Sequence, residues 1–154
     1  MSSRWWGPEF RFATSFTLEA PAQRVHAVLV DLERYCDWWP QVRAVAKVDD
    51  DHALVVCRSR LPYDLELMLT AVSRDPALLE VGLDGPIRGW ARFGLSTRDH
   101  ATSVEFEQEV RAVAPSFAAA SYVAKPLLVW NHEQMMRGLV AALMARTSGP
   151  RGVP

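Results

Sequence analysis

Apolar and polar residues alternate along residues 10–18, where the chain reads FRFATSFTL. Phe10, Phe12 and Phe16 fall on one side of an extended chain, and the residues between them are small or polar, with one arginine. A period of two residues is typical of a half-buried β-strand. The spacing changes after Ala20-Pro21, where we expect a helix to begin because proline is well tolerated at a first helical position.

The helix that follows is amphipathic. Its apolar residues recur at i, i+3, i+4 and i+7 and therefore form one stripe, made of Val25, Val28, Leu29 and Leu32. The Trp38-Trp39-Pro40 segment ends this helical region, because the residue before a proline avoids the α conformation. We expect two short helices after the first strand.

Strand patterns occupy most of the chain between residues 42 and 111. They predict six further strands, over residues 42–48, 53–61, 63–73, 77–83, 87–97 and 102–111. In the last segment Val104, Phe106, Gln108 and Val110 alternate with Glu105, Glu107 and Glu109. We therefore expect Phe106 to be buried and the carboxylates to face solvent. The frequent turn residues between these segments favour hairpins, hence an antiparallel meander.

After Pro115 the period becomes helical and stays so to about Arg146. The apolar stripe of this long helix contains Val123, Leu127, Leu128, Asn131, Met135, Leu139, Ala142 and Leu143. Pro126 either kinks the helix or marks a second start. The element order predicts an α+β domain in which a curved antiparallel sheet of about seven strands wraps around the C-terminal helix. Because a curved sheet and a straight helix diverge, side chains or a ligand must fill the space between them.

Residues at the first helical region carry a resemblance to a known superfamily. Ala20-Pro21, Val25, Asp31, Tyr35, Trp38, Trp39, Pro40 and Val42 follow the pattern "aP…V…D…Y…W.P.V". This resembles the opening of the START/Bet v 1-like superfamily, which includes the bacterial polyketide cyclase/dehydratase-like and coenzyme Q-binding-like proteins. The resemblance covers residues 10–146 in element order. It implies a helix-grip fold with a deep hydrophobic cavity, in a family whose members bind lipids, sterols, quinones or plant hormones, or cyclise polyketides.

Composition narrows the picture further. The 154 residues are 49% hydrophobic and 23% charged, with a formal net charge of -1. These values fit one globular domain over 1–154, with a core of about 10–146 and flexible ends at 1–9 and 147–154. This balance of charges does not indicate a nucleic-acid-binding protein. Cys36 and Cys57 lack the spacing of a zinc site, and the sequence shows neither a signal peptide nor a transmembrane run. We expect a cytoplasmic protein without a metal or cofactor.

The strand and helix registers predict a set of ligand-binding residues. The apolar members are Trp38, Leu67, Leu69, Val81, Phe93, Phe106, Leu128 and Met135. Gln108 and Asn131 fall among them and are expected to orient the ligand through hydrogen bonds, although each has an alternative interpretation as a structural residue. His132 is rotated about 100° from Asn131 and is expected to be a solvated histidine rather than a catalytic base.

One register stays open. If Cys57 and Ser59 face inward, Arg58 is a surface charge; if Leu54 and Val56 face inward, Arg58 enters the cavity and binds an oxyanion. Arg58 and Tyr63 are therefore the candidate polar anchors. The favoured function is non-catalytic binding of a lipid, an isoprenoid or quinone, or a polyketide-like molecule, with no catalytic residue. A polyketide cyclase/aromatase-like enzyme is the first alternative. The second is an interaction module, such as a homodimer, that uses Trp5, Trp6 and Trp90 around a vestigial cavity.

Overall fold

A computed structural model describes residues 9–147 of the chain, apart from the side chains of 116, 117 and 120–123. The expected flexible ends therefore lie mostly outside the described residues. The elements follow in the order β1 (Glu9–Leu18), α1 (Ala22–Val30), η1 (Leu32–Arg34), α2 (Tyr35–Trp38), β2 (Val42–Lys47), β3 (His52–Cys57), β4 (Leu65–Asp75), β5 (Leu78–Asp84), β6 (Ile87–Arg98), β7 (Ala101–Ala112) and α3 (Pro115–Thr147).

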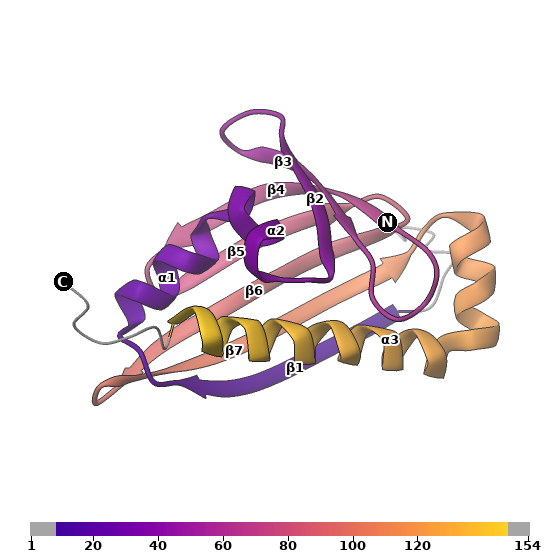
Figure 1. Ribbon diagram of the computed structural model, residues 1–154. Coiled ribbons are helices and arrows are strands. Elements are labelled where there is room, and N and C mark those ends of the chain that lie inside the picture. The colour runs from indigo at the N-terminus through magenta and orange to yellow at the C-terminus, as the bar shows by residue number, and fades with distance from the viewer. Residues whose placement is uncertain (1–8, 148–154) are drawn as a thin grey trace, which may run out of the picture.

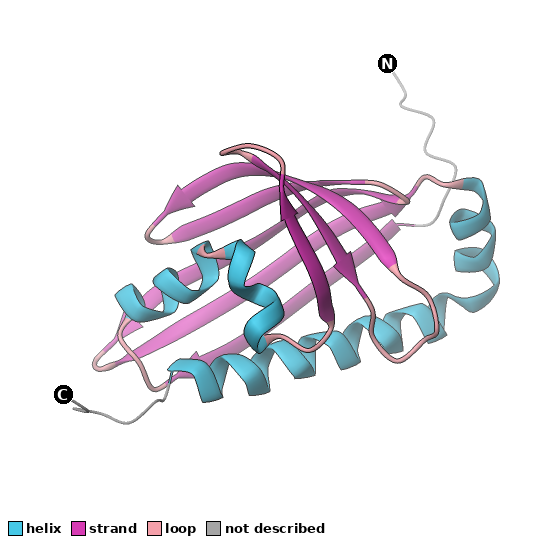
Figure 2. Cartoon of the chain, turned by 45° about the horizontal axis from the view of Figure 1, so that its top comes forward, coloured by secondary structure: helices cyan, strands magenta, loops and turns pink. Residues whose placement is uncertain are grey.

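The strands form one antiparallel seven-stranded sheet in the order β1-β7-β6-β5-β4-β3-β2. It curves strongly, and α3 runs along its concave side while α1 and α2 cover one end of it (Figure 1; Figure 2). The predicted α+β class, the seven strands and the short helices after the first strand are confirmed.

The register of β7 shows which face of the sheet is buried. Phe106 is buried, and Glu105 on its neighbouring position is exposed, as predicted. Glu107 is partly exposed and pairs with Arg92 on β6 through an Nη2–Oε2 contact of 2.8 Å. A slip by one residue would move the carboxylates into the concave side, which is prohibitive for charged groups.

The long helix bends near its proline. Ala124 has non-helical angles (φ -121°, ψ 25°), two residues before Pro126. A proline ring clashes with the preceding turn and removes a hydrogen bond, so the helix changes direction there. Figure 1 shows the N-terminal part of α3 turned away from the longer C-terminal part. Leu127, just past the bend, is exposed, whereas Leu139 and Leu143 are buried as the apolar stripe predicts.

Hydrogen bonds from two aromatic residues fix α2 between α1 and α3. The Tyr35 hydroxyl donates to the carbonyl oxygen of Leu29 at 2.5 Å, and Trp39 Nε1 donates to the carbonyl oxygen of Met135 at 3.2 Å. Burial raises the pKa of Tyr35, so the hydroxyl stays protonated. These bonds satisfy polar groups that would otherwise be costly inside an apolar cluster.

Candidate functional site

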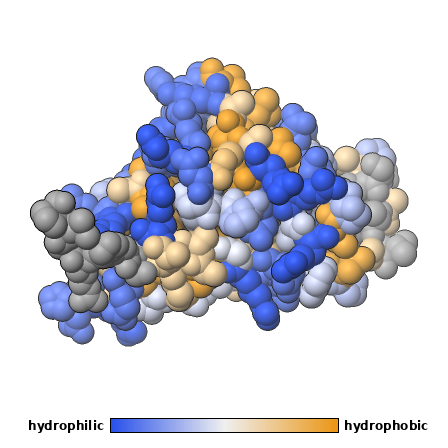
Figure 3. Space-filling model, viewed as in Figure 1, coloured by the Kyte–Doolittle hydropathy of each residue, from blue (hydrophilic) through white to orange (hydrophobic). Residues whose placement is uncertain are grey.

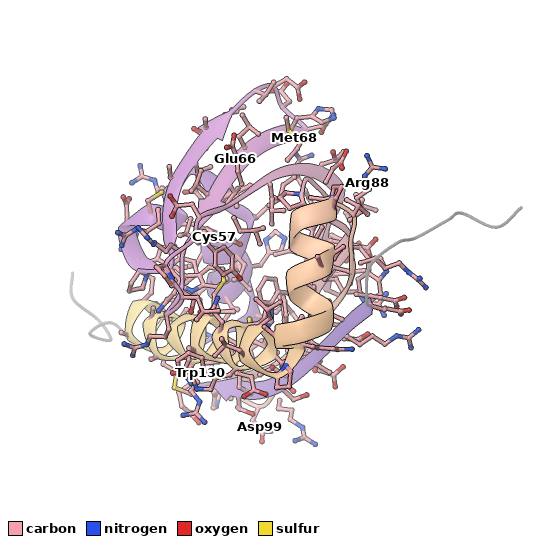
Figure 4. All side chains as sticks on the ribbon, turned by 90° about the vertical axis from the view of Figure 1, so that its right-hand side faces the viewer. Cys57, Glu66, Met68, Arg88, Asp99 and Trp130 are labelled. Atoms are coloured by element: carbon pink, nitrogen blue, oxygen red, sulfur yellow. The ribbon has the colours of Figure 1, made fainter. Side chains whose placement is uncertain are left out.

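A cavity of about 370 Å³ lies between the concave side of the sheet and α3. Strands β1 and β3–β7 contribute alternate residues to its wall, because every second side chain of a strand points to the same face. Figure 4 looks along this space: Cys57 points into the curve of the sheet, and Trp130 lies on the outer side of α3. Most of the wall is aliphatic or aromatic.

Most of the predicted binding residues meet in this wall. Those that line the cavity are Leu67, Leu69, Val81, Phe93, Phe106, Gln108, Leu128, Asn131 and Met135, together with Tyr63. Their role toward a ligand stays a prediction. Trp38 does not line the cavity: it packs against Tyr35, with ring centroids 5.1 Å apart, and its neighbour Trp39 takes the place in the wall.

The main polar feature inside the cavity joins β7 to α3. His132 Nε2 lies 3.0 Å from Gln108 Oε1, and both residues line the cavity. The imidazole stacks on Phe12 of β1, with ring centroids 3.6 Å apart and planes 13° apart. Burial lowers the pKa of His132 from 6.5 to about 4, so the ring is neutral at neutral pH.

The expectation of a solvated His132 is therefore wrong. A position at the edge of the helical stripe would be solvated if α3 packed on a flat sheet. Here the sheet curves around the helix, and β1 covers the edge with Phe12. The available signal was the alternation of β1, which places Phe12 on the inner face, directly opposite Gln108 in the β1–β7 ladder.

Asn131 fastens a loop to the helix. Its Oδ1 accepts a hydrogen bond from the Leu61 amide at 2.8 Å, and its carbonyl oxygen accepts one from the Ser59 hydroxyl at 2.8 Å. Its Nδ2 also donates to the Tyr63 hydroxyl, at 3.4 Å. Asn131 thus forms its hydrogen bonds with the 58–64 loop, as expected for a structural residue. It also forms part of the cavity wall.

The same loop settles the register around Arg58. β3 ends at Cys57 rather than at residue 61, and its buried residues are Ala53, Val55 and Cys57. Arg58 is exposed, with its Nε 3.7 Å from Asp64 Oδ1, so the structure places it as a surface charge and not as a polar anchor. Burial raises the pKa of the Cys57 thiol to about 12, which keeps it protonated and poorly nucleophilic.

Charged residues gather where the cavity meets the surface. Five carboxylates from η1, the residue before it and the β2–β3 turn line this opening; we call them the acidic rim: Asp31, Glu33, Asp49, Asp50 and Asp51. Lys47 and Arg74 are the lysine and arginine among the described lining residues, and both are paired with rim carboxylates. On the face shown in Figure 3, hydrophilic residues lie beside paler and apolar patches.

Trp90 does not line the cavity. The Arg92 guanidinium sits 4.4 Å from the centre of the Trp90 ring, the cation–π contact that a tryptophan between arginines favours. Trp5 and Trp6 fall outside the described residues, so the interaction-module hypothesis stays a prediction. Within residues 9–147, no cluster of three or more potential metal ligands is found, and no helix is long and apolar enough to cross a membrane.

Comparison with known proteins identifies the fold. No protein-family model and no curated protein matches the chain. Solved structures do match, among them the Zhui aromatase/cyclase of Streptomyces sp. R1128, with 15% identity, coverage of 91% of this chain and 94% of that one, and a TM-score of 0.76. A START superfamily protein from Mycobacterium smegmatis matches with 14% identity, 89% and 96% coverage and a TM-score of 0.71. A protein from Thermus thermophilus matches with 18% identity, 92% and 100% coverage and a TM-score of 0.70.

These matches and the architecture together define the fold. The chain has the helix-grip fold of the START/Bet v 1-like superfamily, as the sequence resemblance implies. Identities at this level establish the fold, and the function has to be argued from the site.

Proposed function

We propose that this protein binds a hydrophobic small molecule in the cavity between the sheet and α3. The observation that supports the proposal is the cavity itself: about 370 Å³ lined mostly by aliphatic and aromatic side chains, with most of its charged residues at the acidic rim. Ligand sites are typically concave, roughly 300–1,000 Å³ in volume and mostly apolar, with a small number of placed polar groups. Lipids, isoprenoids, quinones and polyketide-like molecules share the required apolar surface.

The test is direct binding by the purified protein. Native mass spectrometry should show an apolar ligand retained from purification. After incubation with Nile red, it should show the mass of a protein–Nile red complex. Met135→Trp should weaken Nile red binding at least tenfold, because Met135 lies in the cavity wall and the larger ring occupies the space. Circular dichroism must show that the variant is folded.

The matched control lies on the same helix. Met144 is 43% exposed and does not line the cavity, so Met144→Trp introduces the same ring outside the site. It should bind Nile red like the wild type. Equal affinity of a folded Met135→Trp variant and the wild type would refute the cavity as the binding site.

A cyclase/aromatase-like activity is the second candidate, and one observation favours it. His132 is a neutral imidazole inside the cavity, within hydrogen-bonding distance of Gln108. It can accept a proton, although a pKa of about 4 makes it a weak base. Turnover of a poly-β-ketone mimic that His132→Phe abolishes without loss of binding would favour the enzyme over the carrier.

A further inference from the structure

The polar groups inside the cavity and at its opening define the chemistry of the ligand more narrowly. We propose that the cavity selects an uncharged ligand with a carbonyl oxygen, which accepts a hydrogen bond from the side-chain amide of Gln108, and that it discriminates against carboxylates. This inference rests on the binding function proposed above and names its ligand class.

The first step concerns the proton between Gln108 and His132. An amide oxygen can accept a hydrogen bond but cannot donate one. With Gln108 Oε1 3.0 Å from Nε2, the neutral ring must therefore carry its proton on Nε2 and donate it to Gln108. This arrangement occupies the amide oxygen and directs the other end of the amide, with its two N–H groups, away from His132.

The second step concerns what those N–H groups meet. Gln108 lies opposite Ala91 on β6 and Phe12 on β1, and it lines the cavity. Among the described residues, no acceptor for the Gln108 amide nitrogen is found. The amide nitrogen is therefore accessible from the cavity, where its N–H groups can donate to a ligand oxygen. The complementary ligand group is an acceptor, and a carbonyl oxygen is the simplest one.

The third step concerns how firmly the pair is held. The stack of His132 on Phe12, at 3.6 Å between ring centroids, restricts rotation of the imidazole. The ring thereby fixes the orientation of the Gln108 amide before a ligand arrives. A donor that is already oriented costs little entropy on binding, so the pair adds specificity as well as affinity.

The fourth step concerns charge. The cations in the described wall lie at the acidic rim: Lys47 Nζ is 3.4 Å from Asp50 Oδ1, and Arg74 Nη1 is 3.0 Å from Asp51 Oδ1. A ligand carboxylate inside the cavity would find the lysine and arginine of the described wall already paired with rim carboxylates. Burial of an unpaired charge is strongly unfavourable, and the acidic rim also repels an approaching anion.

Three naphthalene ligands of nearly equal shape separate the effect of the carbonyl acceptor from the effect of the negative charge. The first is 2-acetylnaphthalene, the proposed kind of ligand; 2-isopropenylnaphthalene replaces its oxygen with a methylene group; and 2-naphthoate carries the anion. Each is titrated by calorimetry at pH 7.5. We expect 2-naphthoate to bind at least tenfold more weakly than the ketone. Equal or tighter binding of 2-naphthoate overturns the inference, and this comparison requires only the wild-type protein.

A substitution of Gln108 tests its role as the hydrogen-bond donor. Gln108→Leu keeps the size of the side chain and removes the donor, so it should weaken binding of the ketone about tenfold relative to the alkene, the loss of about one hydrogen bond. Gln108→Met is the second variant if the first does not fold. Glu105→Leu, on the exposed face of the same strand, should leave the ketone-to-alkene ratio unchanged.

The outcomes distinguish the two proposals. If the protein binds neither Nile red nor any of the three ligands, the proposed binding function fails. If it binds Nile red but not the ketone, the cavity binds apolar molecules and the ligand class named here falls. If the ligands bind but the ketone-to-alkene ratio is the same in the wild type and the Gln108 variants, the cavity still binds apolar molecules and the role given to Gln108 falls.

Discussion

Acid should destabilise the wild-type protein more than a variant without His132. The pKa of His132 is about 4 in the folded protein and 6.5 as its ordinary value. Because the folded pKa is the lower one, the unfolded chain takes up the proton first as pH falls. The contribution of the neutral ring is fully present above pH 6.5 and is lost as pH falls through 4. At 1.36 kcal/mol per pKa unit the whole loss is roughly 3 kcal/mol, of which about 2 kcal/mol falls between pH 7.5 and pH 5.

Urea denaturation at pH 7.5 and pH 5.0 measures this loss as a difference in the free energy of unfolding. His132→Phe retains an aromatic ring on Phe12 and removes the titrating group, so it should lose about 2 kcal/mol less than the wild type over this interval. His100→Phe, at an exposed turn, is the matched control and should keep the full loss. An identical loss in the wild type and in His132→Phe would show that His132 is not held neutral by burial.

Two further predictions concern single positions. Gly89→Ala should lower the free energy of unfolding by more than about 2 kcal/mol, because a Cβ there would overlap a backbone carbonyl of β7; Gly94→Ala on the same strand, where the nearest atom is 3.8 Å away, should change it by less than about 0.5 kcal/mol. Comparable denaturation midpoints for the two variants would contradict this difference. Asn131→Leu removes the acceptor for the Leu61 amide, so trypsin should cut the 58–64 loop faster than in the wild type while the core stays folded. A cleavage rate equal to that of the wild type would show that other contacts hold the loop.

The sheet and the long helix were predictable because their patterns are long and regular. The alternation of β7 extends over twelve residues, so its period of two and its inner face follow from the sequence. Which of Trp38 and Trp39 lines the cavity could not be predicted from the sequence. α2 has four residues, about one turn, and such a short helix has no stripe from which an inner face can be assigned.

Two features of the site depend on contacts between distant parts of the chain. β3 ends early because the 58–64 loop is bonded to Asn131, about seventy residues further along, and nothing in the local pattern of residues 53–61 shows this. His132 is partly buried and neutral because β1 folds over the edge of α3. Local periodicity reports on the face of an element, but the curvature of a sheet determines how much of a neighbouring helix it covers.

The position of β1 in the sheet has a consequence for the order in which the protein assembles. Strands β2 to β7 pair with their neighbours in sequence, whereas β1 pairs with β7, joining for example Thr14 to Phe106. Contacts between distant residues form late because closure of a long loop has to precede them. During synthesis the first strand leaves the ribosome with its phenylalanines unpaired until most of the sheet has been made. Phe12 and the stack on His132 then close the cavity, so the cavity is completed only when β1 pairs with β7, in the same step that joins the two ends of the domain.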